Sequence, residues 1–257
     1  MRLALVVEYE GTAYHGFQFQ VNACSIQEEI EKAIQRVTGE RLRVKGAGRT
    51  DAGVHAIGQV VAFDTESAHP PSTVVNALNA HLPDYIGVRA AYRVRSDFDP
   101  RRDAASRTYR YTIVNGPTPS PLLRRTAHHV RDRLNVPRMH EASQHFVGLH
   151  DFARFATTLG GPERTTCRSI YEAAVTREGD IVTFDVKGNS FLPRQVRRMA
   201  GALVAVGRGE VSTNELAIMI DGGETDKVAH SLPPNGLCLT AVAYDDFPPD
   251  AGGDYGE

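Results

Sequence analysis

The sequence predicts an α+β protein, because short strands and amphipathic helices follow one another in the same order twice. Apolar alternation or short β-rich runs mark strands over residues 2–8, 41–45, 57–63 and 85–93, and again over 107–114, 168–177, 181–187 and 237–244. Each half then reads strand, helix, strand, strand, helix, strand, which is the split βαβ order of a ferredoxin-like unit. We expect two antiparallel sheets that join or face each other, with a groove between them.

The first half, residues 1–104, has clear helix boundaries. Residues 25–28 read SIQE, a capping box in which the Ser and Glu side chains each satisfy a free backbone N–H. Apolar residues then recur at helical spacing until Gly39, which predicts the end of the helix. A second helix is expected over residues 73–82, where Pro83 stops it.

The second half, residues 105–245, repeats the order with other side chains. Asn135 and Pro137 predict the start of a helix that reaches residue 147, and a short helical turn is expected over 151–155. The strands 168–177 and 181–187 form a hairpin around the turn EGD. A long helix over 191–206 and a shorter one over 212–220 precede the last strand, and residues 246–257 are rich in Gly and Asp, which predicts a disordered tail.

Composition limits the classes of function. The 257 residues suffice for one large or two smaller domains, and no apolar run approaches the ~20 residues of a membrane span. The first eight residues do not form a secretory signal, so we expect a cytoplasmic protein. Three widely spaced cysteines indicate neither disulfides nor a cysteine zinc site. The formal net charge of −2 gives no global attraction to nucleic acid, but the arginines are clustered.

The stretch GAGRTDAGVHA at residues 46–56 is the strongest candidate site. Its three glycines permit positive φ angles and close approach by another molecule, and Arg49 stands two residues before Asp51. The turn connects two strands, so Asp51 lies at a sheet end. Asp51 is either a catalytic carboxylate presented in a cleft or a common turn residue that bonds its own backbone.

Further candidates lie in three other segments. Residues 11–20 are rich in aromatic and amide side chains, which either contact bases or fold over the core. In the helix over 191–206, Arg194, Arg197 and Arg198 point away from the apolar stripe, as a solvated surface or a phosphate-binding strip. Tyr109, on the same strand face as Arg107, is either a core residue or a side chain that stacks on a base.

No cofactor is expected from the motifs. The histidines at 128, 129, 140, 145 and 150 match no recognised ligand spacing, so a metal site is not indicated. The chain has no glycine fingerprint after a strand and no phosphate loop that ends in Gly-Lys-Ser/Thr, so a nucleotide cofactor is not expected either.

The segment GRTDAGVHA at residues 48–56 resembles the active-site motif of tRNA pseudouridine synthases of the A family. The resemblance extends along nearly the whole chain, through EYEGT at 8–12, SIQ at 25–27, NALNA at 76–80, SRTYRY at 106–111, HDF at 150–152, FLPRQVR at 191–197 and GL at 236–237. It implies that a cofactor-free homodimer isomerises uridine to pseudouridine in the anticodon stem-loop of tRNA, at nucleotide positions 38 to 40.

The resemblance also implies roles for single residues. Asp51 corresponds to the nucleophilic aspartate, Tyr109 to the active-site tyrosine and Arg197 to the active-site arginine. The side chains that we predict to contact RNA in the groove are Arg49, Arg107, Tyr109, Arg194, Phe17 and Gln18. Two departures concern RNA contacts: Phe17 stands where the family often has Trp, and Asp99-Pro100 replaces a more usual His-Ala.

The chemistry suits these residue types. A carboxylate can add to C1′ or C6 of the nucleotide, or stabilise charge as the glycosidic bond breaks, and the sequence does not choose among these routes. An Arg partner keeps the acid ionised, and a Tyr can stack on the base and help to remove a proton. A non-catalytic tRNA-binding or RNA-folding module is the main alternative, and a metal-dependent hydrolase is a weaker one.

Overall fold

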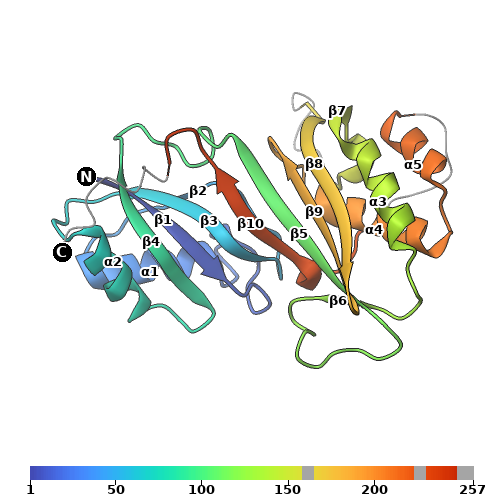
Figure 1. Ribbon diagram of the computed structural model, residues 1–257. Coiled ribbons are helices and arrows are strands. Elements are labelled where there is room, and N and C mark those ends of the chain that lie inside the picture. Colours follow the sequence, from blue (N-terminus) through green and yellow to red (C-terminus); the bar gives the residue numbers. More distant parts are fainter. Residues whose placement is uncertain (158–164, 223–229, 248–257) are drawn as a thin grey trace. The chain divides into compact units, whose positions relative to one another are not determined.

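The computed structural model of the chain describes residues 1–157, 165–222 and 230–247 (Figure 1). It divides into two units, Met1–Ser106 with Leu239–Glu257, and Arg107–Cys238. Mostly antiparallel strands and five α-helices within the described ranges confirm the α+β class. The last strand differs from expectation, because it belongs with the first unit although the sequence order assigns it to the second.

The first unit is a sheet with two helices on one side of it (Figure 1). Its strands lie in the order β4-β1-β3-β10, and short β2 pairs with β3. In chain order the elements are β1 (Arg2–Tyr9), α1 (Ile26–Thr38), β2 (Lys45–Gly46), β3 (His55–Asp64), α2 (Pro71–Asn79), β4 (Ile86–Val94) and β10 (Leu237–Ala243). Ser25 caps α1 by accepting the N–H of Glu28, and Gly39 ends it at φ 78°. Both predicted boundaries of α1 are thereby confirmed.

Both faces of strand β1 are covered. Leu3, Leu5 and Val7 are buried on the face that alternation predicts. On the other face, Ala4 packs in a cluster of buried residues. That cluster includes Phe98, which follows β4, and Phe247, which is only 6% exposed although it lies in the predicted disordered tail. The tail prediction is therefore wrong at Phe247, and residues 248–257 lie outside the described part of the chain.

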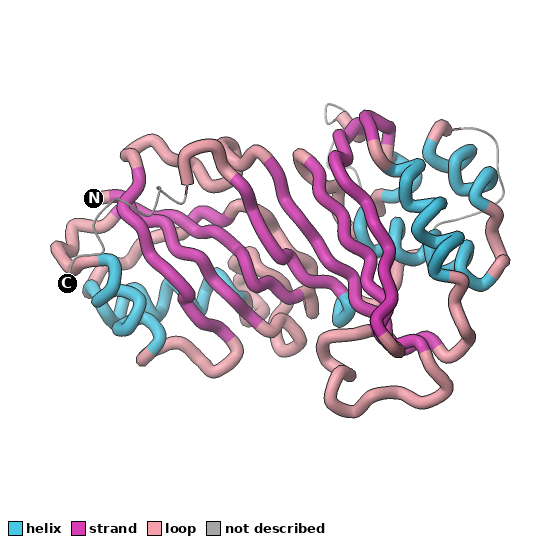
Figure 2. The backbone as a smooth tube through the Cα atoms, viewed as in Figure 1, coloured by secondary structure: helices cyan, strands magenta, loops and turns pink. Residues whose placement is uncertain are grey.

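The second unit also places its helices on one side of its strands (Figure 2). The strand order is β5-β9-β8-β7, with β6 parallel to β5. Its elements are β5 (Ser106–Asn115), β6 (His128–Val130), α3 (Val136–Ser143), the 3₁₀ helices η1 (Gln144–Phe146) and η2 (Ala153–Phe155), β7 (Gly148–Asp151), β8 (Cys167–Glu178), β9 (Ile181–Gly188), α4 (Gln195–Arg208), α5 (Thr213–Ile220) and η3 (Pro234–Gly236). The sequence did not predict β6 or β7.

The exposed face of this sheet is polar and internally paired. Arg110 lies opposite Asp185 across β5 and β9 and forms an ion pair with it at 2.8 Å. Lys187 and Glu172 form a second pair across β9 and β8, also at 2.8 Å. Opposite charges placed directly across from one another contribute to the pairing of these strands.

Helix α4 begins four residues later than predicted. Arg194 adopts a left-handed conformation, with φ 61° and ψ 7°, and helix geometry starts only at Gln195. The buried amide oxygen of Gln195 accepts the N–H of Leu192 at 2.8 Å, which stabilises the turn before the helix. The apolar stripe that the sequence predicts, from Leu192 to Leu203, is buried, but residues 191–194 lie outside the helix and Arg194 is exposed.

Candidate active site

Asp51 is carried by the turn between β2 and β3 and is partly exposed. Its carbonyl oxygen accepts the N–H of Val54 at 3.1 Å, which closes the turn. Of the three glycines that permit positive φ angles in this stretch, only Gly53 adopts one, at 77°. Gly46 is instead required for close packing, as described below. The carboxylate is thus presented by a closed turn at the end of a strand.

The loop that follows β1 packs directly against this turn. The Phe17 N–H donates to the Thr50 carbonyl at 3.1 Å, and the Gly53 N–H donates to the Tyr14 carbonyl at 3.3 Å. Gly16, at φ 96°, passes so close that a Cβ there would lie 2.8 Å from the Thr50 oxygen. Residues 14–17 therefore support the turn through their backbone.

Phe17 is not available as a stacking surface. Its ring is 3% exposed and lies against Gly46, where a Cβ would meet two ring atoms at 2.5 and 2.7 Å. Tyr9 is its aromatic neighbour, with ring centroids 6.4 Å apart. The prediction that Phe17 contacts RNA is wrong in this structure, because the ring fills the core behind the turn. Gln18 is exposed beside it.

Arg49 lies two residues before Asp51 and is exposed. On the other side of Asp51, His55 is 5% exposed and its Nδ1 accepts the Gly11 N–H at 3.0 Å. That bond requires a lone pair on Nδ1, so a neutral His55 carries its proton on Nε2. The first unit therefore supplies a partly exposed acid and an exposed cation on one turn.

The second unit carries the other predicted site residues on β5 and around the start of α4. Tyr109 is 8% exposed, and its ring meets Phe191 edge-on with centroids 5.2 Å apart. Arg107 is also 8% exposed and donates to the Asn189 carbonyl at 2.7 Å. Both residues are thus largely buried, and Arg107 ties β5 to the segment that follows β9.

Arg197 is half-buried in the first turns of α4. Its Nε donates to the Leu232 carbonyl at 2.7 Å, and Tyr111 donates to the next carbonyl, that of Pro233, at 2.8 Å. Burial raises the pKa of Tyr111, and the charge of Arg197 acts in the opposite direction. Arg197 and Tyr111 therefore share one anchoring segment, while exposed Arg194 stands at the helix start.

Sequence reasoning missed the polar side chains behind the Asp51 turn. Gln59 is fully buried, and its amide nitrogen lies 2.9 Å from the Gly48 carbonyl and 3.4 Å from the Tyr9 hydroxyl. Tyr9 in turn lies 2.8 Å from the Thr50 hydroxyl. The available signal was Gln59 itself, since it is a polar residue on the strand face that also carries Val61 and Phe63.

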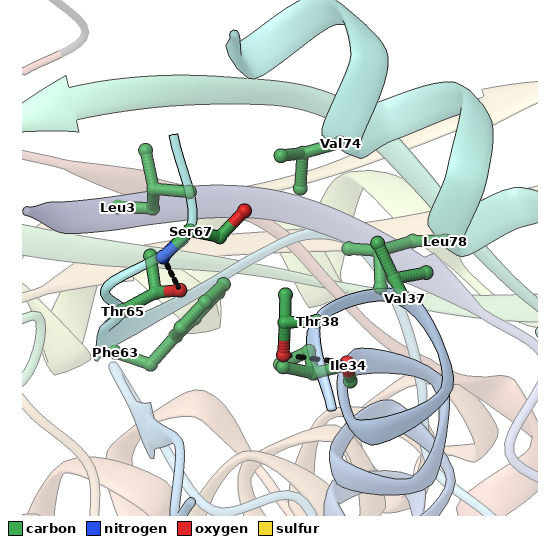
Figure 3. Close-up of a pocket in the computed structure, with 9 residues that line it drawn as sticks. All are labelled: Leu3, Ile34, Val37, Thr38, Phe63, Thr65, Ser67, Val74 and Leu78. Atoms are coloured by element: carbon green, nitrogen blue, oxygen red, sulfur yellow. Dashed lines mark hydrogen bonds between the residues drawn. The ribbon is translucent and has the colours of Figure 1, made fainter. Parts of the chain in front are cut away.

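The described part of the first unit also has a small cavity between α1, α2 and the sheet (Figure 3). Its walls are mainly apolar and include Leu3, Ile34, Phe63 and Leu78. Its volume is about 10 Å³, at the lower limit for a single water molecule. It is too small for a nucleotide and is a packing gap.

Within the described ranges, no three His, Cys, Asp or Glu side chains gather in a way that could hold a metal ion. In the same ranges, every helix is too short or too polar to cross a membrane.

Known proteins resemble the chain over nearly its whole length. The family model described as tRNA pseudouridine synthase matches residues 5–101 and 142–245. A tRNA pseudouridine synthase A from Geotalea daltonii is 42% identical over 242 residues, which cover 94% of this chain and 99% of that protein. A protein of the same description from Geobacter sulfurreducens is 43% identical over 242 residues, with 94% and 99% coverage. One from Acetivibrio thermocellus is 40% identical over 240 residues, with 93% and 98% coverage.

These relatives place the chain among enzymes that modify RNA. The family match covers well over half of the residues, and the identities extend across almost the full length of both partners. The chain belongs to the tRNA pseudouridine synthase family. The resemblance seen in the sequence motifs is confirmed, and so is the assignment as an isomerising enzyme.

Proposed function

We propose that this chain isomerises uridine to pseudouridine at positions 38, 39 and 40 in the anticodon stem-loop of tRNA, with Asp51 as the nucleophile. Family membership supports the reaction and the tRNA substrate. The observation that carries the residue assignment is the presentation of Asp51, a partly exposed carboxylate on a closed turn, within the motif at residues 48–56. A rigidly held acid is the group that such a reaction needs.

The reaction is an isomerisation that consumes no co-reactant. The N1–C1′ bond breaks, the base turns over, a C5–C1′ bond forms, and the C5 proton leaves while N1 gains one. The Asp51 carboxylate adds to C1′ or C6, or stabilises the charge that develops at C1′. We assign Tyr109 to base stacking and removal of the C5 proton, and we give Arg197 the role of the family's active-site arginine.

Binding of the RNA falls to exposed polar groups. Arg49, Gln18 and Arg194 are exposed, so their side chains are available to phosphate oxygens and base edges. The target nucleotide must leave its stack to reach Asp51, and cations that hold the flanking phosphates offset part of that cost. Arg107, like Tyr109, is 8% exposed, and both stay among the residues that we propose to contact the RNA.

Several finer points belong to the same proposal. Each unit is taken as ferredoxin-like: in the first, the order β1-α1-β2-β3-α2-β4 and the sheet β4-β1-β3 with β2 beside β3 support this. We further propose a cytoplasmic homodimer that needs no cofactor. The groove expected between the two sheets stays a prediction.

The decisive experiment is Asp51→Asn, which keeps the size of the side chain and removes its charge. We expect release of tritium from tRNA labelled at uridine C5 to fall by more than about 10³-fold, because removal of a covalent catalyst is costly. The dissociation constant for tRNA should change by less than about 3-fold, since phosphate contacts supply most of the affinity. Asp84→Asn, at an exposed site in the same unit, is the matched control and should leave tritium release unchanged.

Undiminished release by the Asp51 variant would exclude Asp51 as the catalyst and would leave a tRNA-binding role. The target positions are tested separately by mapping pseudouridine in a tRNA transcript with uridine at 38, 39 and 40. Modification at other positions, with none at these three, would overturn the proposed substrate site.

A further inference from the structure

Three buried polar side chains lie behind the Asp51 turn in the first unit. Tyr9, from β1, is 3% exposed, Thr50 is 7% exposed, and Gln59, from β3, is fully buried. The Tyr9 and Thr50 hydroxyls are 2.8 Å apart. The Gln59 amide nitrogen lies 2.9 Å from the Gly48 carbonyl oxygen and 3.4 Å from the Tyr9 hydroxyl. These groups connect two strands to the turn.

The orientation of the Gln59 amide follows from the Gly48 carbonyl, which can only accept. The Gln59 NH₂ group must therefore face it, and the same NH₂ group donates to the Tyr9 oxygen. The Tyr9 hydroxyl also bonds the Thr50 hydroxyl, and either of the two can be the donor. The hydrogen-bonded chain runs from Gln59 through Tyr9 to Thr50, the residue before Asp51.

The geometry holds the turn at two points. Gly48 is anchored three residues before Asp51 and Thr50 one residue before it. The Thr50 backbone is held as well, because its carbonyl accepts the Phe17 N–H at 3.1 Å. Tyr9 and Gln59 lie on β1 and β3, which pair with each other. Val7 lies opposite Gln59, and the register shifts between Val7 and Tyr9. Such a bulge redirects a side chain.

Core packing alone does not explain why position 59 holds a Gln. Its amide oxygen is buried and makes no hydrogen bond within the described residues. A buried acceptor without a partner is destabilising, and an apolar side chain of similar size would avoid that cost. The presence of Gln59 is explained by the two bonds that its amide nitrogen donates.

We propose that Gln59, Tyr9 and Thr50 form a positioning chain that fixes the Asp51 carboxylate for catalysis. This inference rests on the proposed role of Asp51. The three are positioning residues, since they act through the turn. A displacement of reacting groups by about 1 Å can lower a rate by ~10²-fold, so the chain affects kcat far more than substrate binding.

The test uses the full-length enzyme and isosteric variants. Tyr9→Phe, Thr50→Val and the double variant each remove the bond between the two hydroxyls. We expect each of them to lower kcat by about 10- to 100-fold, with KM for tRNA within about 2-fold of wild type. The double variant should lose no more than Tyr9→Phe alone, because Thr50→Val breaks only the bond between the two hydroxyls, which Tyr9→Phe already breaks together with the Gln59–Tyr9 bond. Its urea midpoint should be close to wild type, because two apolar groups replace a bonded pair.

Two further variants separate positioning from structure. Thr50→Ser keeps the hydroxyl and should retain kcat within about 3-fold, whereas Gln59→Met removes the Gly48 anchor and should lower kcat about 10-fold or more. Thr65→Val is the matched control: it removes another buried hydroxyl of the unit, which bonds Glu40 at 2.6 Å away from the turn. It should leave kcat unchanged.

Wild-type kcat in both Tyr9→Phe and Thr50→Val would overturn the inference. A loss of activity equal to the fraction of unfolded protein, or an effect on KM alone, would overturn it as well. An active Asp51→Asn variant would instead refute the proposed catalyst. If Asp51→Asn is inactive and the three positioning variants are fully active, only the positioning chain is refuted.

Discussion

Replacing Gly46 by Ala should destabilise the first unit through one identifiable collision. A Cβ at Gly46 would lie 2.5 and 2.7 Å from the Cε1 and Cζ atoms of Phe17. Carbon atoms in contact are about 3.5–4.0 Å apart, so the ring must move by about 1 Å. Its backbone cannot easily follow, because the Phe17 N–H bonds Thr50 and the Phe17 carbonyl accepts the Gln27 N–H at 2.9 Å.

The size of the effect follows from this confinement. Overpacking of a well-packed core costs about 1–3 kcal/mol, and the buried ring places Gly46→Ala near the middle of that range, at about 2 kcal/mol. Phe17→Leu alone leaves a small cavity and should cost about 1–2 kcal/mol, less than the ~3–5 kcal/mol of a Phe→Ala change. In the double variant the smaller side chain makes room for the new methyl group. The destabilisation of the double variant should therefore be about 1 kcal/mol smaller than the sum of the two single destabilisations.

Urea unfolding at constant pH measures these three free energies, with the m-value as a check that the unfolding transition is unchanged. Tritium release measures the effect on the Asp51 turn. We expect the Gly46→Ala variant to lose more activity than its fraction of unfolded protein explains. A wild-type urea midpoint for Gly46→Ala, or simple additivity in the double variant, would refute the packing argument. Wild-type stability of Phe17→Leu with a raised KM for tRNA would restore the stacking role predicted from the sequence.

Three further predictions concern other parts of the chain. Arg194→Gly should raise the urea midpoint by an amount that corresponds to about 1 kcal/mol, because Gly adopts the left-handed φ of 61° without strain, and should weaken tRNA binding at low salt. A lower midpoint would contradict it. Burial, with help from the charges of Arg208 and His129, lowers the pKa of His128 below its ordinary 6.5, so its stabilising effect is present above that pH and lost as pH falls. His128→Gln should therefore lose less stability than wild type between pH 7 and pH 5, and an equal loss would exclude His128 as a source of acid sensitivity. Phe247→Ala should cost about 3 kcal/mol in urea unfolding, since its ring is 6% exposed and meets Tyr92 edge-on at 5.2 Å; no change would remove Phe247 from the core.

The sequence predicted the parts of the fold that depend on local periodicity. Alternation along residues 2–8 identified the buried face of β1, and the Ser25 cap and Gly39 bounded α1 correctly. The second buried face of β1 was not predictable in this way. Its cover comes from Phe98 and Phe247, which lie outside any periodic segment and reach β1 only through the tertiary fold. The four residues of β7 were missed for a similar reason, since they carry no alternation and are fixed by pairing with β8.

The glycines around Asp51 show why the site itself was only partly predictable. The three glycines were expected to permit positive φ angles, yet positive φ occurs only at Gly53. Gly46 is small because a ring lies against it, and Gly11 and Gly16, outside the motif, are small because backbone of the turn lies against them. At Gly11 a Cβ would overlap the Val54 carbonyl oxygen, and a backbone oxygen cannot rotate away as a side chain can. The position of Asp51 is therefore set by backbone contacts between the motif and the loop after β1, and that loop belongs to the candidate site as much as the motif does.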